Sequence, residues 1–315
     1  MTAKKIFVAD IGGTNSRFAW FVQKENELTE QQSFCLATRS AHSFPELFLQ
    51  LRQSGFPTHI SRKNRVVIAG AGPVQNEKYC RLTNVAWDID LTTVSSLSHG
   101  QVINDFVAQA FACLSSPQNG HIRIIQTGCT KKASPIAVIG AGTGLGHCAL
   151  LLSPCGQWLP FPSEAGSTLF SFWGEEEREF ARFFLAQNKG LPPRADQIVS
   201  GQGLGLVHTF FTGSTKKPED FIHEIRPGCP TTALFSRFYG RACRQYALTV
   251  MPGRLFISGG IAAKNPFFLE HKNFLEELHN CPKHKQFLQT LPVSLLTVKE
   301  PGLFGAAVYA QQATN

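Results

Sequence analysis

The segment Val8–Arg17, with the sequence VADIGGTNSR, constrains the fold more than any other stretch of the chain. The apolar run Ile6–Ala9 ends in the carboxylate of Asp10, and two glycines and two small polar residues follow. A second apolar run, Phe18–Val22, comes directly after them. Because glycine enters turn conformations at no steric cost, this pattern predicts a tight hairpin between two strands.

Two more glycine-rich turns follow predicted strands: GAGTGLG at 140–146 and SGGI at 258–261. The chain has no Gly-Lys-Ser/Thr, which excludes a P-loop. GAGTGLG also departs from the dinucleotide fingerprint, because Leu145 replaces the last glycine and a strand follows rather than a helix. Successive N–H groups in such turns form anion-binding nests, and the hydroxyl of Thr14 or Thr143 adds a donor. A single turn of this kind is more often an ordinary hairpin, but its recurrence favours phosphate binding.

The carboxylate of Asp10 beside the first turn would by itself repel a phosphate. A divalent cation between the two removes the conflict, because such a cation takes oxygen ligands from carboxylates and phosphates together. We therefore expect the acid to serve a metal ion and the glycines to serve a polyphosphate.

The apolar pattern predicts the same plan twice: three strands, helix, strand, helix, strand, helix. In the first copy we expect strands at 6–10, 18–22, 33–37, 66–71 and 102–105, and helices at 43–52 and after Asp90. In the second we expect strands at 136–140, 147–152, 158–160, 255–258 and 293–298, and helices at 175–185, 231–250, 266–278 and 301–311. The repetition indicates duplication of a whole domain.

Composition excludes several classes of protein. The 315 residues are 43% hydrophobic, yet no apolar run is long enough for a membrane helix, and the N-terminus has no signal-peptide pattern. The nine cysteines are scattered without a C-x-x-C pair, and His279, Cys281 and His284 are interpreted as an ordinary surface turn. The net charge of +8 is dispersed. We expect a cytoplasmic protein that binds neither membrane nor nucleic acid.

Six segments together carry a resemblance to a known family. They are VADIGGTNSRFAW, VINDFVAQAFA, IAVIGAGTGLG, PSEAGS, VSGQGLG and FISGGIAAKN. In this order they resemble bacterial glucokinases of the actin-like ATPase superfamily, from Ile6 to about Tyr309. A Cys-rich zinc motif, which marks the repressor-related sugar kinases of that superfamily, is absent from the sequence.

The resemblance implies an α/β protein with a duplicated ribonuclease-H-like fold and two lobes with a cleft between them. The small lobe would be 1–106, joined by the C-terminal helix 301–315, and the large lobe 107–300. It further implies transfer of the γ-phosphate of Mg-ATP to the 6-hydroxyl of glucose, at the entry to glycolysis, by a homodimer. Asp10 would hold Mg²⁺ through water. The residues implied to bind ATP are Ala9, Asp10, Ile11, Gly12, Gly13, Thr14, Gly142, Thr143, Gly144, Gly259 and Gly260.

Asp105 is the candidate catalytic base, because it ends the strand expected at 102–105 and a carboxylate can accept the proton of a sugar hydroxyl. Its alternative role, as a cap for the helix starting at Phe106, is equally compatible with the sequence, and the resemblance decides for catalysis. Asn104 and Glu164 offer partners to sugar hydroxyls, although Glu164 can also be an ordinary surface acid. Asn84 is a further sugar-binding candidate, and its neighbour Trp87 is more often a packed core residue.

The chain departs from the glucokinase pattern at two places. Ser167 stands where the family has a sugar-binding His, and the segment 187–189 has no acid where a second sugar-binding Glu is expected before SGQG. Fewer partners for sugar hydroxyls mean weaker discrimination among sugars. A kinase for another hexose or amino sugar, a non-catalytic sugar sensor and an actin-like nucleotide switch therefore stay open. The pair Asn104–Asp105 favours an enzyme, because neither a sensor nor a switch needs a base.

Overall fold

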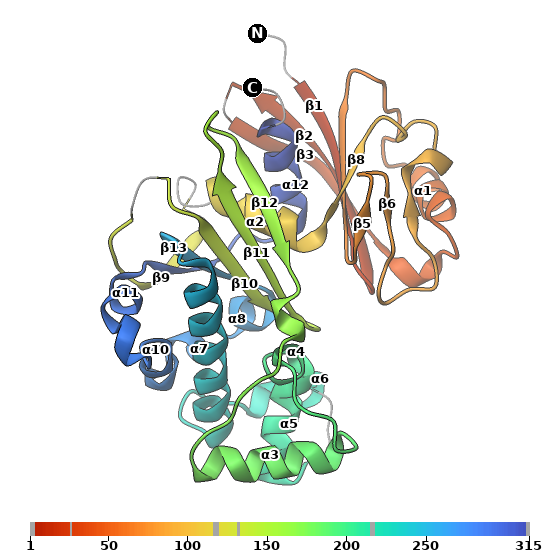
Figure 1. Cartoon of the computed structure of the whole chain (residues 1–315). Helices are drawn as coiled ribbons and strands as arrows, with labels where there is room; N and C mark the ends of the chain where they lie inside the picture. Colours follow the sequence, from red (N-terminus) through yellow and green to blue (C-terminus); the bar gives the residue numbers. More distant parts are fainter. Residues whose placement is uncertain (1–3, 26, 116–119, 131–132, 215–217, 313–315) are drawn as a thin grey trace. The chain divides into compact units, whose positions relative to one another are not determined.

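The computed structural model describes residues 4–25, 27–115, 120–130, 133–214 and 218–312. The chain divides into two compact units, whose elements are labelled in Figure 1. The first unit comprises Met1–His121, Pro154–Pro160 and Val298–Asn315, and the second comprises Ile122–Ser153 and Phe161–Thr297. The lobe boundary predicted after residue 106 falls inside helix α2 (Asp105–Ser115), which belongs as a whole to the first unit. The assignment of two functional lobes stays a prediction.

The first unit is built on a five-stranded sheet with the order β3-β2-β1-β4-β8. Its strands are β1 (Lys4–Ile11), β2 (Asn15–Lys24), β3 (Glu27–Ala37), β4 (Arg65–Gly70) and β8 (Gln101–Asn104). Strands β1 to β3 pair antiparallel, whereas β1, β4 and β8 run parallel. A small separate sheet contains β5 (Val74–Gln75), β6 (Tyr79–Cys80) and β7 (Ile89–Asp90). All five strands predicted here are confirmed, and β3 begins earlier than predicted.

Helices cover the sheet of the first unit. The predicted helix α1 (Phe44–Gln53) starts at the cap Ser43 and buries Phe44, Leu47 and Leu51 in a core that includes Phe7 of β1. Helix α2 packs against α12 (Pro301–Gln312), and both contact β4 (Figure 1). After Asp90 only the short 3₁₀ helix η2 (Leu91–Thr93) forms, with the Asp90 carboxylate accepting the Thr92 N–H at 2.9 Å. A second short one, η1, spans Thr38–Ser40.

The second unit repeats the strand order of the first. Its sheet has the order β12-β11-β10-β13-β14-β9. The strands are β9 (Ile122–Gln126), β10 (Ile136–Ala141), β11 (Leu145–Leu152), β12 (Trp158–Ser163), β13 (Arg254–Ser258) and β14 (Val293–Leu296). When the strands of each main sheet are numbered from β1 and from β10 in chain order, with β5 to β7 left out, both sheets have the order third, second, first, fourth, fifth. The second adds β9 antiparallel to β14. The predicted repetition of one plan is confirmed at the level of sheet order.

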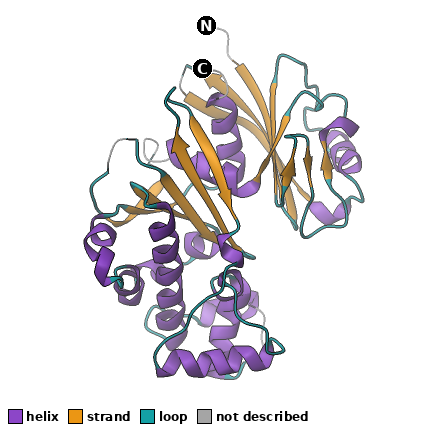
Figure 2. Ribbon diagram, viewed as in Figure 1, coloured by secondary structure: helices purple, strands orange, loops and turns teal. Residues whose placement is uncertain are grey.

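The helices of the second unit are α3 (Glu175–Gln187), α4 (Ala195–Ile198), α5 (Gly201–Thr212), α6 (Pro218–Phe221), α7 (Pro230–Val250), α8 (Gly260–Lys264), α9 (Phe267–Glu270), α10 (Lys272–Leu278) and α11 (Lys285–Thr290), with 3₁₀ helices at Ala165–Ser167 (η3), Ile222–Glu224 (η4) and Pro282–His284 (η5). Among them, α7 and α8 contact the sheet at β10, whereas α3 and α5 pack on other helices beyond one end of it (Figure 2). Within the described part of the chain, no helix is both long and apolar enough to cross a membrane.

Three features of the second unit differ from the sequence prediction. The single helix expected at 266–278 is two helices, because His271 takes an extended conformation and its ring nitrogen accepts the Asn273 N–H at 3.2 Å. Strand β9 and the helices α4, α5, α6, α8 and α11 were not predicted. The final strand ends at Leu296 rather than at Val298.

A buried charged cluster ties three helices of this unit together. Arg241 of α7 is fully buried and donates to both carboxylate oxygens of Glu177 in α3, at 2.7 and 2.8 Å. It also donates to Glu277 of α10 at 2.9 Å. Its guanidinium carbon lies 3.4 Å from the ring centre of Trp173. A buried charge needs such partners, so the cluster fixes the chain segment that leads into α3.

The contact between α12 and α2 depends on Gly305. A Cβ at this position would lie 1.7 Å from the Ala108 carbonyl oxygen, which is a backbone atom. Alanine normally stabilises a helix relative to glycine, but here we expect Gly305→Ala to lower the free energy of unfolding by about 1–3 kcal/mol through overpacking. Urea unfolding measures the change. Gly260→Ala is the matched control, since no described atom lies within 4 Å of its Cβ position. Equal effects of the two substitutions would contradict this packing.

Candidate active site

The first glycine hairpin joins β1 to β2 and is held by its own backbone and one threonine. The Gly12 N–H donates to the Asn15 carbonyl at 3.0 Å. The fully buried Thr38 donates from its hydroxyl to the Gly12 carbonyl at 2.7 Å and from its N–H to the Thr14 carbonyl at 2.9 Å. The predicted turn is therefore confirmed as a fixed loop, with the Thr14 side chain exposed.

Asp10 lies at the carboxyl end of β1, partly buried against the C-terminal helix. A Cβ on Gly302 of α12 would lie 2.2 Å from an oxygen of the Asp10 carboxylate. Opposite Asp10 in the β-ladder, Arg17 pairs with Glu300 at 2.9 Å. Burial raises the pKa of Asp10 to about 6, while Arg17 lowers it and Glu300 raises it further. The carboxylate is thus poorly solvated, and a cation would stabilise its charged form.

The ends of three parallel strands bring the predicted acids to one edge of the sheet. In the ladder, Ile11 of β1 is level with Gly70 of β4, and Gly70 is level with Asn104 of β8. Asp10 and the pair Asn104–Asp105 therefore emerge at the same edge. In open α/β sheets, ligands bind at the carboxyl ends of the parallel strands.

The side-chain amide of Asn104 is largely engaged within the protein. Its oxygen accepts the N–H groups of Phe106 and Val107, at 2.9 and 3.4 Å, and its nitrogen donates to the Gly72 carbonyl at 3.1 Å. An amide has two N–H donors, so one is left for a ligand. The structure thus gives Asn104 a helix-capping role that the sequence interpretation had assigned to its neighbour.

Asp105 is the first residue of α2 and directly follows the cap. Its carboxylate accepts the Phe106 N–H at 2.9 Å. The helix, however, begins at Asp105 itself and Asn104 is its cap, so the capping alternative for Asp105 is corrected. Asp105 also lies near the thiol of Cys80. Burial, followed by the charge of Asp105, raises the pKa of Cys80 to about 12. The role of Asp105 as catalytic base stays a prediction.

Asn84 packs directly against the first hairpin. A Cβ on Gly13 would lie 2.6 Å from the Asn84 Cβ, so only glycine fits opposite this residue. The Asn84 side chain is exposed and donates to the Thr83 hydroxyl at 3.2 Å. Trp87 is buried, and its indole donates to the Ala41 carbonyl at 2.8 Å. The packed interpretation of Trp87 is therefore confirmed.

The second glycine hairpin joins β10 to β11 and has an open outer surface. The Gly142 N–H donates to the Gly144 carbonyl at 2.8 Å, and a strand follows at Leu145 as predicted. Thr143 and Gly144 are exposed. No described atom lies within 4 Å of a Cβ built on Gly142 or Gly144. The open Cβ positions leave room for a ligand to approach the backbone of this turn closely, which phosphate-binding turns require.

The start of α5 lies against this hairpin. The Gly201 N–H donates to the Gly142 carbonyl at 2.9 Å. Ser200 caps the helix by accepting the Gly203 N–H at 3.2 Å. A helix N-terminus attracts anions through its free N–H groups and its dipole. The sequence prediction omitted Gly201, although the motif VSGQGLG contains it.

The turn Gly259–Gly260 packs on the same hairpin from β13. Gly259 has φ +90°, and a Cβ there would lie 2.4 Å from the Ala141 carbonyl oxygen. Glycine is required on both counts, since other residues rarely adopt this conformation. Helix α8 begins at Gly260, whose Cβ position is open. The two predicted glycine turns of the second unit are therefore in backbone contact.

The predicted sugar loop lies beside the hairpin of the second unit. Glu164 and Ser167 are both exposed at the ends of η3, and the Ser167 N–H donates to the Glu164 carbonyl at 2.9 Å. Between them, a Cβ on Gly166 would lie 2.2 Å from the Leu145 carbonyl oxygen. The loop is therefore held close to the start of β11.

The helix directly before the SGQG motif carries an acid that the sequence analysis did not consider, because that analysis placed this helix too early, at 187–189. Those residues end α3, whereas the helix directly before Ser200 is α4, which carries Asp196. The Cβ of Asp196 lies 3.5 Å from the position of a Cβ on Gly166, so this acid lies at the sugar loop. Its carboxylate pairs with Arg194 at 3.2 Å and is 26% exposed. The acid was missed because the four residues of α4 carry no helical periodicity.

Few of the described side chains are placed to bind a metal ion. Among the residues that the structure describes, no group of three His, Cys, Asp or Glu side chains could hold a metal ion. His279 instead shares a hydrogen bond of 2.6 Å with Gln126. A single carboxylate at Asp10 fits Mg²⁺, which protein sites commonly hold through one or two carboxylates, water and substrate phosphates.

The fold is that of sugar kinases. A glucokinase from Balamuthia mandrillaris, solved in complex with glucose, superposes with a TM-score of 0.79 at 19% identity, over 98% of this chain and 93% of the other. A ROK family glucokinase from Streptomyces griseus, solved with glucose and AMPPNP, has a TM-score of 0.63 at 18% identity, over 99% and 100% of the two chains.

Sequence comparison identifies the family within the class of sugar kinases. The Glucokinase family profile matches residues 7–313. A glucokinase from Pectobacterium atrosepticum is 29% identical over 324 residues, covering 98% of this chain and 97% of its own. The chain belongs to the glucokinase family, as the motifs predicted.

Asp10 makes the stability of the metal-free protein depend on pH. Its pKa is about 6 in the folded state against an ordinary value of 3.8. Between these values the folded state keeps a proton that the unfolded chain has lost, so stability falls as the pH rises from about 4 to 6. Asp10→Asn does not titrate and should exceed the wild type by about 1–3 kcal/mol at pH 7, with a smaller difference at pH 4. Urea unfolding at both pH values measures this, and a pH-independent difference would contradict it.

Proposed function

We propose that this protein transfers the γ-phosphate of Mg-ATP to the 6-hydroxyl of glucose. The observation that carries the proposal is the arrangement at the edge of the first sheet. Asp10, the first glycine hairpin and Asp105 emerge there together, in a chain that belongs to the glucokinase family. A metal-binding acid, a phosphate-binding turn and a base are the groups that phosphoryl transfer to an alcohol needs.

In this proposal the two units are the two lobes of a duplicated ribonuclease-H-like fold. The hairpins at Gly12–Thr14 and Gly142–Gly144 contact the phosphates, and the turn Gly259–Gly260 completes the nucleotide site. The open Cβ positions at Gly142, Gly144 and Gly260 support this role. Each turn offers N–H donors in a fixed geometry, so their alignment costs little when charge builds up on the phosphoryl group.

Asp10 is the proposed Mg²⁺ residue, acting through water. Bound Mg²⁺ would neutralise charge on the phosphates of ATP. The cramped position against Gly302 supports a water-mediated contact, since the carboxylate has protein on one side. A nearby cation would also lower the raised pKa of Asp10, so metal binding is expected to release a proton near pH 6.

Asp105 accepts the proton of the attacking sugar hydroxyl. The capped position at the start of α2 fixes the direction of its carboxylate. The remaining N–H of Asn104 and the exposed amide of Asn84 are proposed to bind other hydroxyls. In the second unit, Glu164, Ser167 and Asp196 contribute, and their shared packing around Gly166 supports one sugar-binding group. Family membership supports a cytoplasmic homodimer.

A second candidate activity is phosphorylation of another hexose or an amino sugar. The specific observation is Ser167, where the family pattern has a histidine. ADP release measured with glucose, mannose, fructose and glucosamine separates the candidates. Glucose as the best substrate supports the first proposal, a different sugar supports the second, and no sugar-dependent ADP release contradicts both.

Asp105→Asn tests the catalytic base. Asparagine keeps the carbonyl oxygen that accepts the Phe106 N–H, so the protein is expected to fold and to bind glucose. It cannot take a proton, and kcat should fall by about 10²–10⁴-fold. Asp220→Asn, which changes an exposed acid of α6, is the control and should leave kcat unchanged. A mutant that keeps more than about a tenth of the parent rate contradicts the assignment.

Ser167→His tests the origin of sugar specificity. An imidazole can donate to one hydroxyl and accept from another, whereas serine reaches less far. One gained hydrogen bond is expected to lower the KM for glucose about twofold to tenfold and to widen the preference over mannose. Leu169→His adds the same side chain at an exposed position of the loop and should have no effect. The measurement is kcat/KM for each sugar, and an unchanged preference would exclude position 167 as a determinant.

A further inference from the structure

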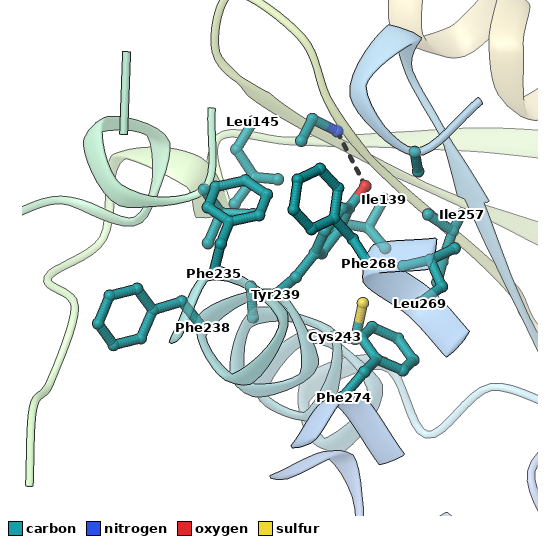
Figure 3. Packing of buried hydrophobic residues seen from close by; sticks show 14 of the residues in the cluster. Ile139, Leu145, Phe235, Phe238, Tyr239, Cys243, Ile257, Phe268, Leu269 and Phe274 are labelled. Atoms are coloured by element: carbon teal, nitrogen blue, oxygen red, sulfur yellow. Dashed lines mark hydrogen bonds between the residues drawn. The ribbon is translucent and has the colours of Figure 1, made fainter. Parts of the chain in front are cut away.

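A tyrosine that no catalytic role requires connects the two glycine turns of the second unit. Tyr239 lies on α7 and is fully buried. Its hydroxyl oxygen accepts the Ala141 N–H at 3.2 Å, which Figure 3 marks with a dashed line. The same hydroxyl donates to the Ser258 carbonyl at 3.5 Å, the outer limit of a hydrogen bond. Ala141 directly precedes the hairpin at Gly142, and Ser258 directly precedes Gly259.

The hydroxyl lies where the β-ladder stops. Strands β10 and β13 pair in parallel up to Gly140 and Ser258. Beyond this pair the chain turns away at Gly259, with φ +90°. The Ala141 N–H therefore lies beyond the last rung, and a buried N–H without a partner costs free energy comparable to a lost hydrogen bond. Tyr239 supplies that partner and so extends the link between the strands by one residue.

Packing leaves the phenol ring little freedom. Phe235 and Phe274 surround it edge-to-face, with ring centres at 6.2 and 6.1 Å, and Cys243 lies one turn further along α7 (Figure 3). Burial also raises the pKa of Tyr239, so the hydroxyl stays protonated and able to donate. The donor and acceptor are therefore held in place before any ligand binds.

We infer that Tyr239 is a positioning residue for the nucleotide, which fixes the hairpin 141–144 relative to the turn 258–260. The inference rests on the proposed function of these two turns in ATP binding. Tyr239 touches no substrate in this account. It acts through the backbone of Ala141, so its loss should weaken nucleotide binding and leave sugar binding intact.

The test compares Tyr239→Phe with Tyr246→Phe. Tyr246 lies on the same helix, is buried, and its hydroxyl has no hydrogen-bond partner among the described residues. Tyr239→Phe removes the hydroxyl with both of its hydrogen bonds, and it is expected to raise the KM for ATP and the Kd for AMPPNP by about threefold to tenfold. The KM for glucose should stay within about twofold of the wild type, and Tyr246→Phe should change none of these values.

Each result decides the inference. A shift in the constants for nucleotide alone supports it. An unchanged Kd for AMPPNP, or equal shifts for nucleotide and glucose, overturns it and indicates general structural support. If the wild type phosphorylates no sugar, the proposed function fails, yet the Kd for AMPPNP still tests Tyr239. If Tyr239→Phe does not fold, amide hydrogen exchange of Ala141 in the wild type decides instead: slow exchange supports the inference, and rapid exchange overturns it.

Discussion

The contact between the Asp10 carboxylate and the bare Cα of Gly302 is the constraint on which the rest of the first unit depends. Any side chain at position 302 would collide with the acid. The C-terminal helix α12 must therefore return to β1 with a glycine at this point. A few residues later, Gly305 allows the same helix to approach Ala108 of α2, the helix that Asp105 begins. The two glycines of this helix therefore help to set the positions of both proposed functional acids. The burial that results raises the pKa of Asp10.

The second unit has the same strand order as the first, but its proposed nucleotide site consists mainly of backbone groups. Gly166, Gly201 and Gly259 lie where a hairpin is approached within van der Waals distance. Such contacts leave N–H groups rather than side chains facing outward, which suits phosphate because a fixed dipole needs no deprotonation and little reorganisation. The hydroxyl of Tyr239 stabilises this backbone from within, whereas the charged cluster around Arg241 holds the segment that leads into α3.

Local pattern was enough to predict what lies within one element or one turn. The strands of both copies, the hairpins at Gly12 and Gly142 and the amphipathic helix α1 follow from alternation, glycine position and capping at Ser43. Features that depend on tertiary contacts were missed. The break at His271 depends on a side-chain bond to the backbone, and α4 is too short to have a period.

The site residues also fall into those that a local pattern predicts and those that depend on tertiary contacts. Asp10 and Asp105 could be named because Asp10 lies at the end of one strand and Asp105 directly follows another, and the parallel register brings them to one edge. Tyr239 could not be found, since it joins Ala141 from a helix almost a hundred residues away in sequence. The capping role of Asn104 was missed because Asn and Asp at adjacent positions are both good caps, and only the contacts show that Asn104 is the cap.

The central claim is that these turns and acids transfer phosphate from ATP to a sugar. The most direct measurement is ³¹P NMR of the wild-type protein with Mg-ATP and glucose. The account predicts that the γ-phosphate signal of ATP is replaced by equal amounts of ADP and of a phosphate monoester coupled to the C6 protons of glucose. Conversion of ATP to ADP and inorganic phosphate, with no sugar phosphate formed, would contradict it.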